Sequence, residues 1–93
     1  MAQEISLGKA LRTIRKARGL SQEAFSDVSS RTYLSSLERG LKSPTLNKLS
    51  ELCDVMQVHP LTLVALAYGR DIKGAEQLFA RVREELDEVL AAN

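Results

Sequence analysis

The segment 20–44 carries polar side chains whose types and spacing suit contact with a nucleic acid. An apolar stripe at Leu34 and Leu37 predicts a helix in its second half, and the other face of that helix is small and polar. An arginine can donate two hydrogen bonds to guanine, and small hydroxyl groups can approach thymine methyl groups. The candidates for contact with DNA base edges are therefore Arg31, Thr32, Ser35 and Ser36.

Further polar residues lie just before and after this helix, where a nucleic-acid backbone would pass. Backbone N–H groups at a helix N-terminus attract phosphate, which favours Gln22 at the start of the preceding segment. Tyr33 either packs or gives its hydroxyl to a phosphate, and Arg39 either binds phosphate or stabilises its own helix C-terminus. The candidates for phosphate contact are Gln22, Ser30, Tyr33, Arg39, Lys42 and Ser43.

The charge is distributed unevenly, although the whole chain of 93 residues has a net charge of only +1. Residues 1–44 hold eight basic and four acidic residues, whereas residues 45–93 hold five basic and eight acidic ones. Phosphate binding depends on the local field and not on the sum over the chain. The alternative is that these charged side chains are only solvated and that their uneven distribution has no role in binding.

Helical periodicity and helix end signals account for most of the chain, and strand alternation is not sustained anywhere. The class predicted is therefore all-α. The expected helices are 6–18, a helix that follows Ser21 with Ala24 and Phe25 in the core, 31–39 capped by Ser30 or Ser29, 46–56 capped by Thr45, a short helix from Pro60 to a break at 68–69, and 71–91. The second and third form a helix-turn-helix, which places its second helix in the major groove of DNA.

The C-terminal helix has an apolar stripe with alternating spacings of three and four residues, which is a heptad pattern. It consists of Ile72, Ala75, Phe79, Val82, Leu86 and Val89. This stripe either folds back on the core of the same domain or pairs with a second subunit, and the intersubunit role is favoured. The expected dimer interface is Phe79, Val82, Leu86 and Val89, and the expected division is a domain 1–68 followed by a C-terminal element 69–93.

Short fragments in order along residues 7–66 resemble the XRE-type regulators, the family of phage Cro and repressor proteins. The fragments are Arg15, GLSQE at 19–23, YLS at 33–35, LERG at 37–40 and SPTL at 43–46. The resemblance implies a five-helix lambda-repressor-like DNA-binding domain, to which this chain adds the C-terminal amphipathic helix. It also implies a phosphate contact by Gln22, base reading around Arg31, Thr32 and Ser36, and an ion pair between Arg15 and Glu38.

The turn before the 31–39 helix departs from the family pattern, because residues 27–30 (DVSS) contain no glycine and are fewer than is usual. Ser29 and Ser30 can cap the helix, and Val28 can fill the core in place of the usual turn residue. The shortening is expected to rotate the helix about its axis, which bears on the individual base readers more than on the fold.

Other chemistry is nearly absent from the sequence. His59 precedes Pro60 without partners at metal-ligand spacing, and Cys53 lies on an apolar helix face, which favours a buried thiol. No catalytic motif, cofactor or metal site is expected, and we do not expect an enzyme or a small-molecule ligand. The absence of a long apolar run or a signal-peptide pattern favours a cytoplasmic protein, associated with the nucleoid when bound to DNA.

Three functions fit these features. The first is a transcriptional regulator that binds double-stranded DNA as a homodimer on a near-palindromic operator and has no ligand-sensing domain. The second is an antitoxin-like autoregulator whose C-terminal helix binds a partner protein. The third is a protein-interaction module that has lost DNA binding, and a steep salt dependence of DNA binding would separate the first from it.

Overall fold

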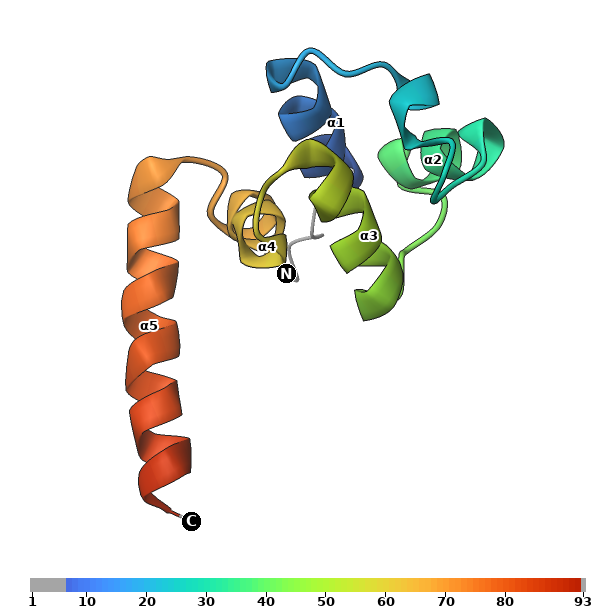
Figure 1. Ribbon diagram of the computed structural model, residues 1–93. Coiled ribbons are helices and arrows are strands. Elements are labelled where there is room, and N and C mark those ends of the chain that lie inside the picture. Colours follow the sequence, from blue (N-terminus) through green and yellow to red (C-terminus); the bar gives the residue numbers. More distant parts are fainter. Residues whose placement is uncertain (1–6, 93) are drawn as a thin grey trace.

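The computed structural model describes residues 7–92, which form five α-helices and one short 3-10 helix (Figure 1). The elements are α1 (Leu7–Ala17), η1 (Gln22–Phe25), α2 (Arg31–Glu38), α3 (Leu46–Met56), α4 (Pro60–Gly69) and α5 (Ile72–Ala91). The all-helical class predicted from the sequence is confirmed for the described residues. Ser6, where the first helix was expected to begin, lies outside them.

A single apolar core joins all the elements that precede α5. Phe25 of η1, Leu34 of α2, Leu52 of α3 and Leu63 of α4 are almost completely buried in it. Burying each such side chain contributes about 1.5–3 kcal/mol relative to leaving it exposed. The cluster consists of Ala10, Leu11, Ile14, Phe25, Leu34, Leu37, Leu49, Leu52, Cys53, Met56, Leu63 and Ala67. Because all of its members lie between residues 10 and 67, the core closes without any buried residue from α5.

Side-chain caps mark where four of the helices begin, and the cap of α5 is Asp71, whose Oδ1 accepts a hydrogen bond from the Gly74 N–H at 2.8 Å. The hydroxyl oxygens of Ser30 and Thr45 accept hydrogen bonds from the backbone N–H groups of Tyr33 and Lys48, as predicted. His59 caps α4, because its Nδ1 accepts a hydrogen bond from the Leu61 N–H at 3.0 Å. These caps satisfy N–H groups that have no partner inside the helix.

The second expected helix is only a four-residue 3-10 turn, which corrects the prediction of a helix capped by Ser21. The Ser21 side chain makes no cap hydrogen bond, and backbone bonds such as Ala24 N–H to Ser21 O span three residues. Phe25 is the only buried residue of η1, and Ala24, expected in the core, is exposed. Short 3-10 turns of this kind are common as connectors between α-helices.

Helix α5 packs on α4 at its start, and the rest of it projects away from the molecule toward the C-terminus (Figure 1). It meets α4 only near its start, where the backbones approach so closely that a Cβ on Gly74 would lie 2.0 Å from the carbonyl oxygen of Gly69. Every residue of α5 is described, and none is buried. The alternative in which this helix folds back on its own core is therefore not the arrangement found.

Among the described residues, no single helix is long and apolar enough to cross a membrane. The helices α3 and α4 reach the necessary length and composition only as a pair, which is bent by 101° at the break between them.

Candidate nucleic-acid interface

The start of α2 presents the predicted polar face at the end of the molecule opposite to α5 (Figure 1). Arg31 and Thr32 are exposed on the first turn, and Ser35 is half-buried one turn later. Ser36 does not belong to this face, because only 9% of it is exposed and α2 turns it toward the interior. The role of Ser36 as a base contact therefore remains a prediction, which this burial does not favour.

The residues around α2 that were predicted to contact phosphate lie at its surface. Ser30, Arg39, Lys42 and Ser43 are exposed. Tyr33 is half-buried and its ring packs against the core, so the packing role is confirmed for the ring. The Lys42 ammonium lies 5.6 Å from the centroid of that ring, which is within the range of a cation–π contact. This contact brings the side chain of Lys42, in the loop after α2, beside Tyr33 of the helix.

An ion-pair network fixes α2 to α1 from the inside. Arg15 Nε donates to Glu38 Oε2 at 2.6 Å and Arg15 NH2 donates to Glu38 Oε1 at 3.0 Å, which is the bidentate pair implied by the family resemblance. The two side chains are only 10% and 5% exposed. Arg15 NH1 also donates to the carbonyl oxygen of Leu20 at 2.9 Å, so the network includes the turn before η1.

The pair changes the pKa values of both its members. The hydrogen bond with Glu38 raises the pKa of Arg15 against the opposing effect of burial. Burial alone would raise the pKa of Glu38, but hydrogen bonds from Arg15 and Gln22 and the charges of Arg15 and Arg12 outweigh it, so that pKa is lowered. Glu38 needs these partners, because a carboxylate at a helix C-terminus is otherwise unfavourable.

Gln22 faces the interior as well as the surface. Its Nε2 donates to Glu38 Oε1 at 3.2 Å, and the residue is half-buried. The amide group expected at a phosphate therefore also belongs to the network that orients α2. Sequence reasoning missed this second role, because residues 22 and 38 meet only after α1, η1 and α2 have packed.

The surface of residues 7–44 is strongly basic once the internal pair is set aside. Because Arg15 is buried against Glu38, the exposed charges are seven cations and two carboxylates. The cations are Lys9, Arg12, Lys16, Arg18, Arg31, Arg39 and Lys42, and the carboxylates are Glu23 and Asp27. Such an excess favours polyanion binding, which the net charge of the whole chain conceals.

One of those carboxylates lies beside the first candidate base reader. Glu23 Oε2 is 3.8 Å from Arg31 NH2, and the two side chains are 78% and 71% exposed. An exposed pair at this distance contributes little to stability. It nevertheless places a negative charge beside Arg31 at the exposed start of α2.

A lysine from another helix supports the turn before α2. Lys48 of α3 donates from Nζ to the carbonyl oxygen of Val28 and forms an ion pair with Glu51 at 2.8 Å. The short turn 26–30 thus has a support from α3 as well as the packing of Val28 against the core. Nothing in the local sequence indicates this contact, because the two residues lie 20 positions apart.

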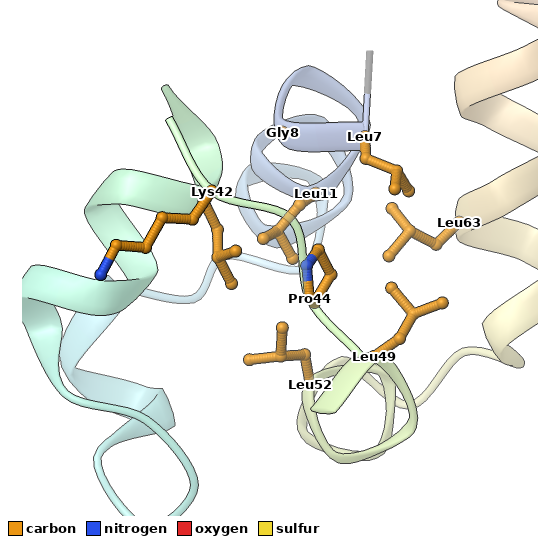
Figure 2. Close-up of a pocket in the computed structure, with 9 residues that line it drawn as sticks. Leu7, Gly8, Leu11, Lys42, Pro44, Leu49, Leu52 and Leu63 are labelled. Carbon is orange, nitrogen blue, oxygen red and sulfur yellow. The ribbon is translucent and has the colours of Figure 1, made fainter. Parts of the chain in front are cut away.

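A small internal space and the thiol of Cys53 both lie in the apolar core. A space of about 10 Å³ lies among leucines of α1, α3 and α4, and the Lys42 ammonium points away from it (Figure 2). It has room for one water molecule at most and is lined mainly by apolar side chains. Cys53 is completely buried, and burial raises the pKa of its thiol, which fits the inert role predicted for it.

An exposed polar helix start, oriented from inside by an ion pair and surrounded by cations, defines a helix-turn-helix DNA-binding domain. Comparison with known proteins agrees, because residues 11–63 match the helix-turn-helix family model. That match covers more than half of the chain, and so the chain belongs to the XRE-type helix-turn-helix family of DNA-binding transcription regulators. The resemblance noted in the sequence is confirmed.

Two kinds of curated relative are similar to the chain. The transcriptional regulator ClgR from two strains of Mycobacterium tuberculosis is 35% identical over 74 residues, which are 77% of this chain and 65% of that protein. The HTH-type transcriptional regulator y4dJ of Sinorhizobium fredii is 40% identical over 60 residues, which are 62% of this chain and 78% of that protein. The chain thus spans a little less than two thirds of the length of ClgR. No solved structure matches it significantly.

Proposed function

We propose that the chain regulates transcription by binding double-stranded DNA as a homodimer on a near-palindromic operator. The start of α2 enters the major groove, with Arg31, Thr32 and Ser35 at base edges. The flanking contacts to phosphate come from Gln22, Ser30, Tyr33, Arg39, Lys42 and Ser43. The observation that carries this proposal is the exposed polar start of α2 within a surface of seven cations and two carboxylates.

A dimer follows from the small size of this contact. One recognition helix reads only a few base pairs, whereas two copies one helical turn apart, about 34–36 Å, double the contacts on one face of the DNA. Helix α5 has the exposed apolar stripe for the intersubunit contact, with Phe79 at 52%, Val82 at 40% and Leu86 at 53% exposure, and with Val89 also exposed. We assign the dimer interface to these four residues.

The test begins with selection of bound sequences from a random DNA pool by the intact protein. Arg31→Ala should cost about 1–3 kcal/mol on the selected site and relax the preference at one position of each half-site. Lys42→Ala should weaken binding to all sequences alike. It should also reduce the slope of log affinity against log salt concentration by about one.

Lys73→Ala is the matched control, because it removes the same charge from exposed α5 at the far end of the molecule. A selected site whose base preference is unchanged by Arg31→Ala would remove Arg31 as a reader. Binding that does not weaken with salt in any variant would contradict DNA binding through this surface.

The same exposed stripe also favours a second candidate, an autoregulator whose α5 binds a different protein. In that case the purified chain would sediment as a monomer at micromolar concentration and still bind DNA with the salt dependence described above. A dimer that persists at those concentrations would contradict this candidate.

A further inference from the structure

The apolar stripe of α5 continues beyond the point where α4 ends. Ile72 is 77% exposed, and the residues at 79, 82, 86, 89 and 90 are exposed large hydrophobics as well. The second half of the helix runs clear of every other described element (Figure 1). Most of the stability of a helix in a protein comes from packing of its amphipathic face, so the second half of α5 gains stability by burying its stripe.

The charges of α5 are unevenly distributed along the helix. This distribution favours one direction of pairing with a second copy of α5 over the other. Residues 72–83 hold three basic residues and one acidic residue, whereas residues 84–91 hold four acidic residues and no basic one. A second copy aligned parallel would set the acidic halves side by side. In an antiparallel copy at the register proposed below, residues 84–89 lie against residues 72–77, which hold one lysine and one glutamate, so the acidic segments no longer oppose each other.

We propose that α5 of one copy pairs antiparallel with α5 of a second copy, in the register that places Phe79 opposite Val82 of the second copy. The same register places Ile72 opposite Val89 and brings Glu76 to Arg83, each of which flanks the stripe. The proposal rests on the homodimer proposed above and adds its orientation and register. A parallel coiled coil would instead set Glu76 near Asp71 and Arg83 near Leu78 of the second copy.

The antiparallel arrangement also places the two DNA-binding domains at opposite ends of the helix pair. The centre of the pairing lies between residues 80 and 81, and each domain joins α5 at its start. With a rise of 1.5 Å per residue, the two starts at residue 72 lie about 26 Å apart along the pair. A parallel pair would hold the starts only about 8–10 Å apart.

Disulfide formation between single-cysteine variants of the full chain tests the direction. Ile72→Cys and Val89→Cys chains are refolded together and oxidised, with the native Cys53 retained because it is buried. We expect the mixed disulfide between the two variants and little of either self-linked species, because only opposed residues come within bridging distance. If the main product were the disulfide between two Val89→Cys chains, the antiparallel arrangement would be overturned, while the proposed homodimer would still be supported.

Charge reversal tests the register. Glu76→Arg should weaken dimerisation about tenfold at low salt by facing Arg83, and adding Arg83→Glu should restore it. Glu84→Arg, which makes the same charge change away from the stripe, is the control and should leave dimerisation within about twofold of the parent. A double reversal that fails to restore the dimer overturns the register.

A parent chain that sediments as a monomer overturns both the register and the homodimer. DNA binding by the same sample, measured separately, shows whether the DNA-binding part of the proposed function survives.

Discussion

At the scale of single residues, the ion pair between Arg15 and Glu38 holds α2 in its orientation relative to α1. The pair is bidentate, nearly buried and joined by Gln22, so it links α1, η1 and the end of α2 at one point. Removing one member of such a pair lowers the free energy of unfolding strongly, because the other member is left as a buried charge without a partner.

Glu38→Gln should therefore destabilise the protein by roughly 3–5 kcal/mol, measured as the free energy of unfolding in urea. Glu85→Gln provides the matched control, because Glu85 pairs with Arg81 at 3.2 Å on an exposed face and its loss should change stability by less than about 1 kcal/mol. Equal effects of the two substitutions would show that the internal pair is not buried in solution.

The same pair predicts a pH dependence. Because the pKa of Glu38 is lowered in the folded state, its contribution is fully present above the ordinary glutamate pKa of about 4.3 and is lost as the pH falls through the folded value. The stability difference between the parent and Glu38→Gln should therefore shrink below about pH 4. A difference that stays constant from pH 7 to pH 3 would contradict the lowered pKa.

Glu23 offers a second prediction at this scale, because its carboxylate lies 3.8 Å from Arg31. Glu23→Gln should strengthen DNA binding by about two- to fivefold at low salt, with a smaller gain at high salt. Glu84→Gln on α5 is the control and should leave affinity unchanged. If fluorescence anisotropy finds no gain with Glu23→Gln at low salt, the start of α2 does not approach the DNA in the way proposed.

At the scale of elements, the joint between α4 and α5 depends on two glycines. Alanine normally stabilises a helix interior relative to glycine by about 1 kcal/mol. At Gly74 a Cβ would lie 2.0 Å from the carbonyl oxygen of Gly69, so the backbone there would have to move. The direction of α5, and with it the placement of the dimer stripe, thus depends on this close contact.

We expect Gly74→Ala to weaken dimerisation and operator binding while leaving the melting of the core nearly unchanged, since the core cluster lies between residues 10 and 67. Gln77→Ala, an exposed change in the same helix, should affect neither property. Calorimetry and sedimentation measure the two effects separately. A variant more stable than the parent and equally dimeric would show that the joint tolerates a side chain.

At the scale of the whole molecule, DNA contact and self-association are assigned to opposite ends, in α2 and α5 (Figure 1). We expect Val82→Asp combined with Leu86→Asp to give a folded monomer that binds the operator weakly, because charges on the stripe oppose its burial. Gln77→Asp combined with Ala91→Asp, which adds the same two charges at exposed positions away from the stripe, is the control. Sedimentation velocity and the melting temperature are the measurements.

A double variant that remains dimeric would move the interface elsewhere, most reasonably to α4 around the exposed Leu61. A double variant that unfolds would show that the monomer is not stable alone. In that case the melting temperature of the parent should rise with protein concentration, as mass action requires for a folded dimer.

The sequence by itself determined the features that depend on near neighbours along the chain. Helical periodicity located the α-helices, while Ser30 and Thr45 marked two of their starts through caps that act within three residues. Ordered family fragments predicted the pair of Arg15 with Glu38, which would not follow from periodicity alone.

Only the tertiary structure decided the features that depend on how the elements pack. The burial of Ser36, the inward contact of Gln22 and the support of Val28 by Lys48 depend on the rotation of α2 about its axis and on residues 16 to 20 positions apart. The 3-10 form of η1, with Phe25 as its buried residue, is also seen only in the structure. The projection of α5 follows from a core that closes before α5 begins, so an amphipathic pattern alone could not tell whether its stripe turns inward or outward.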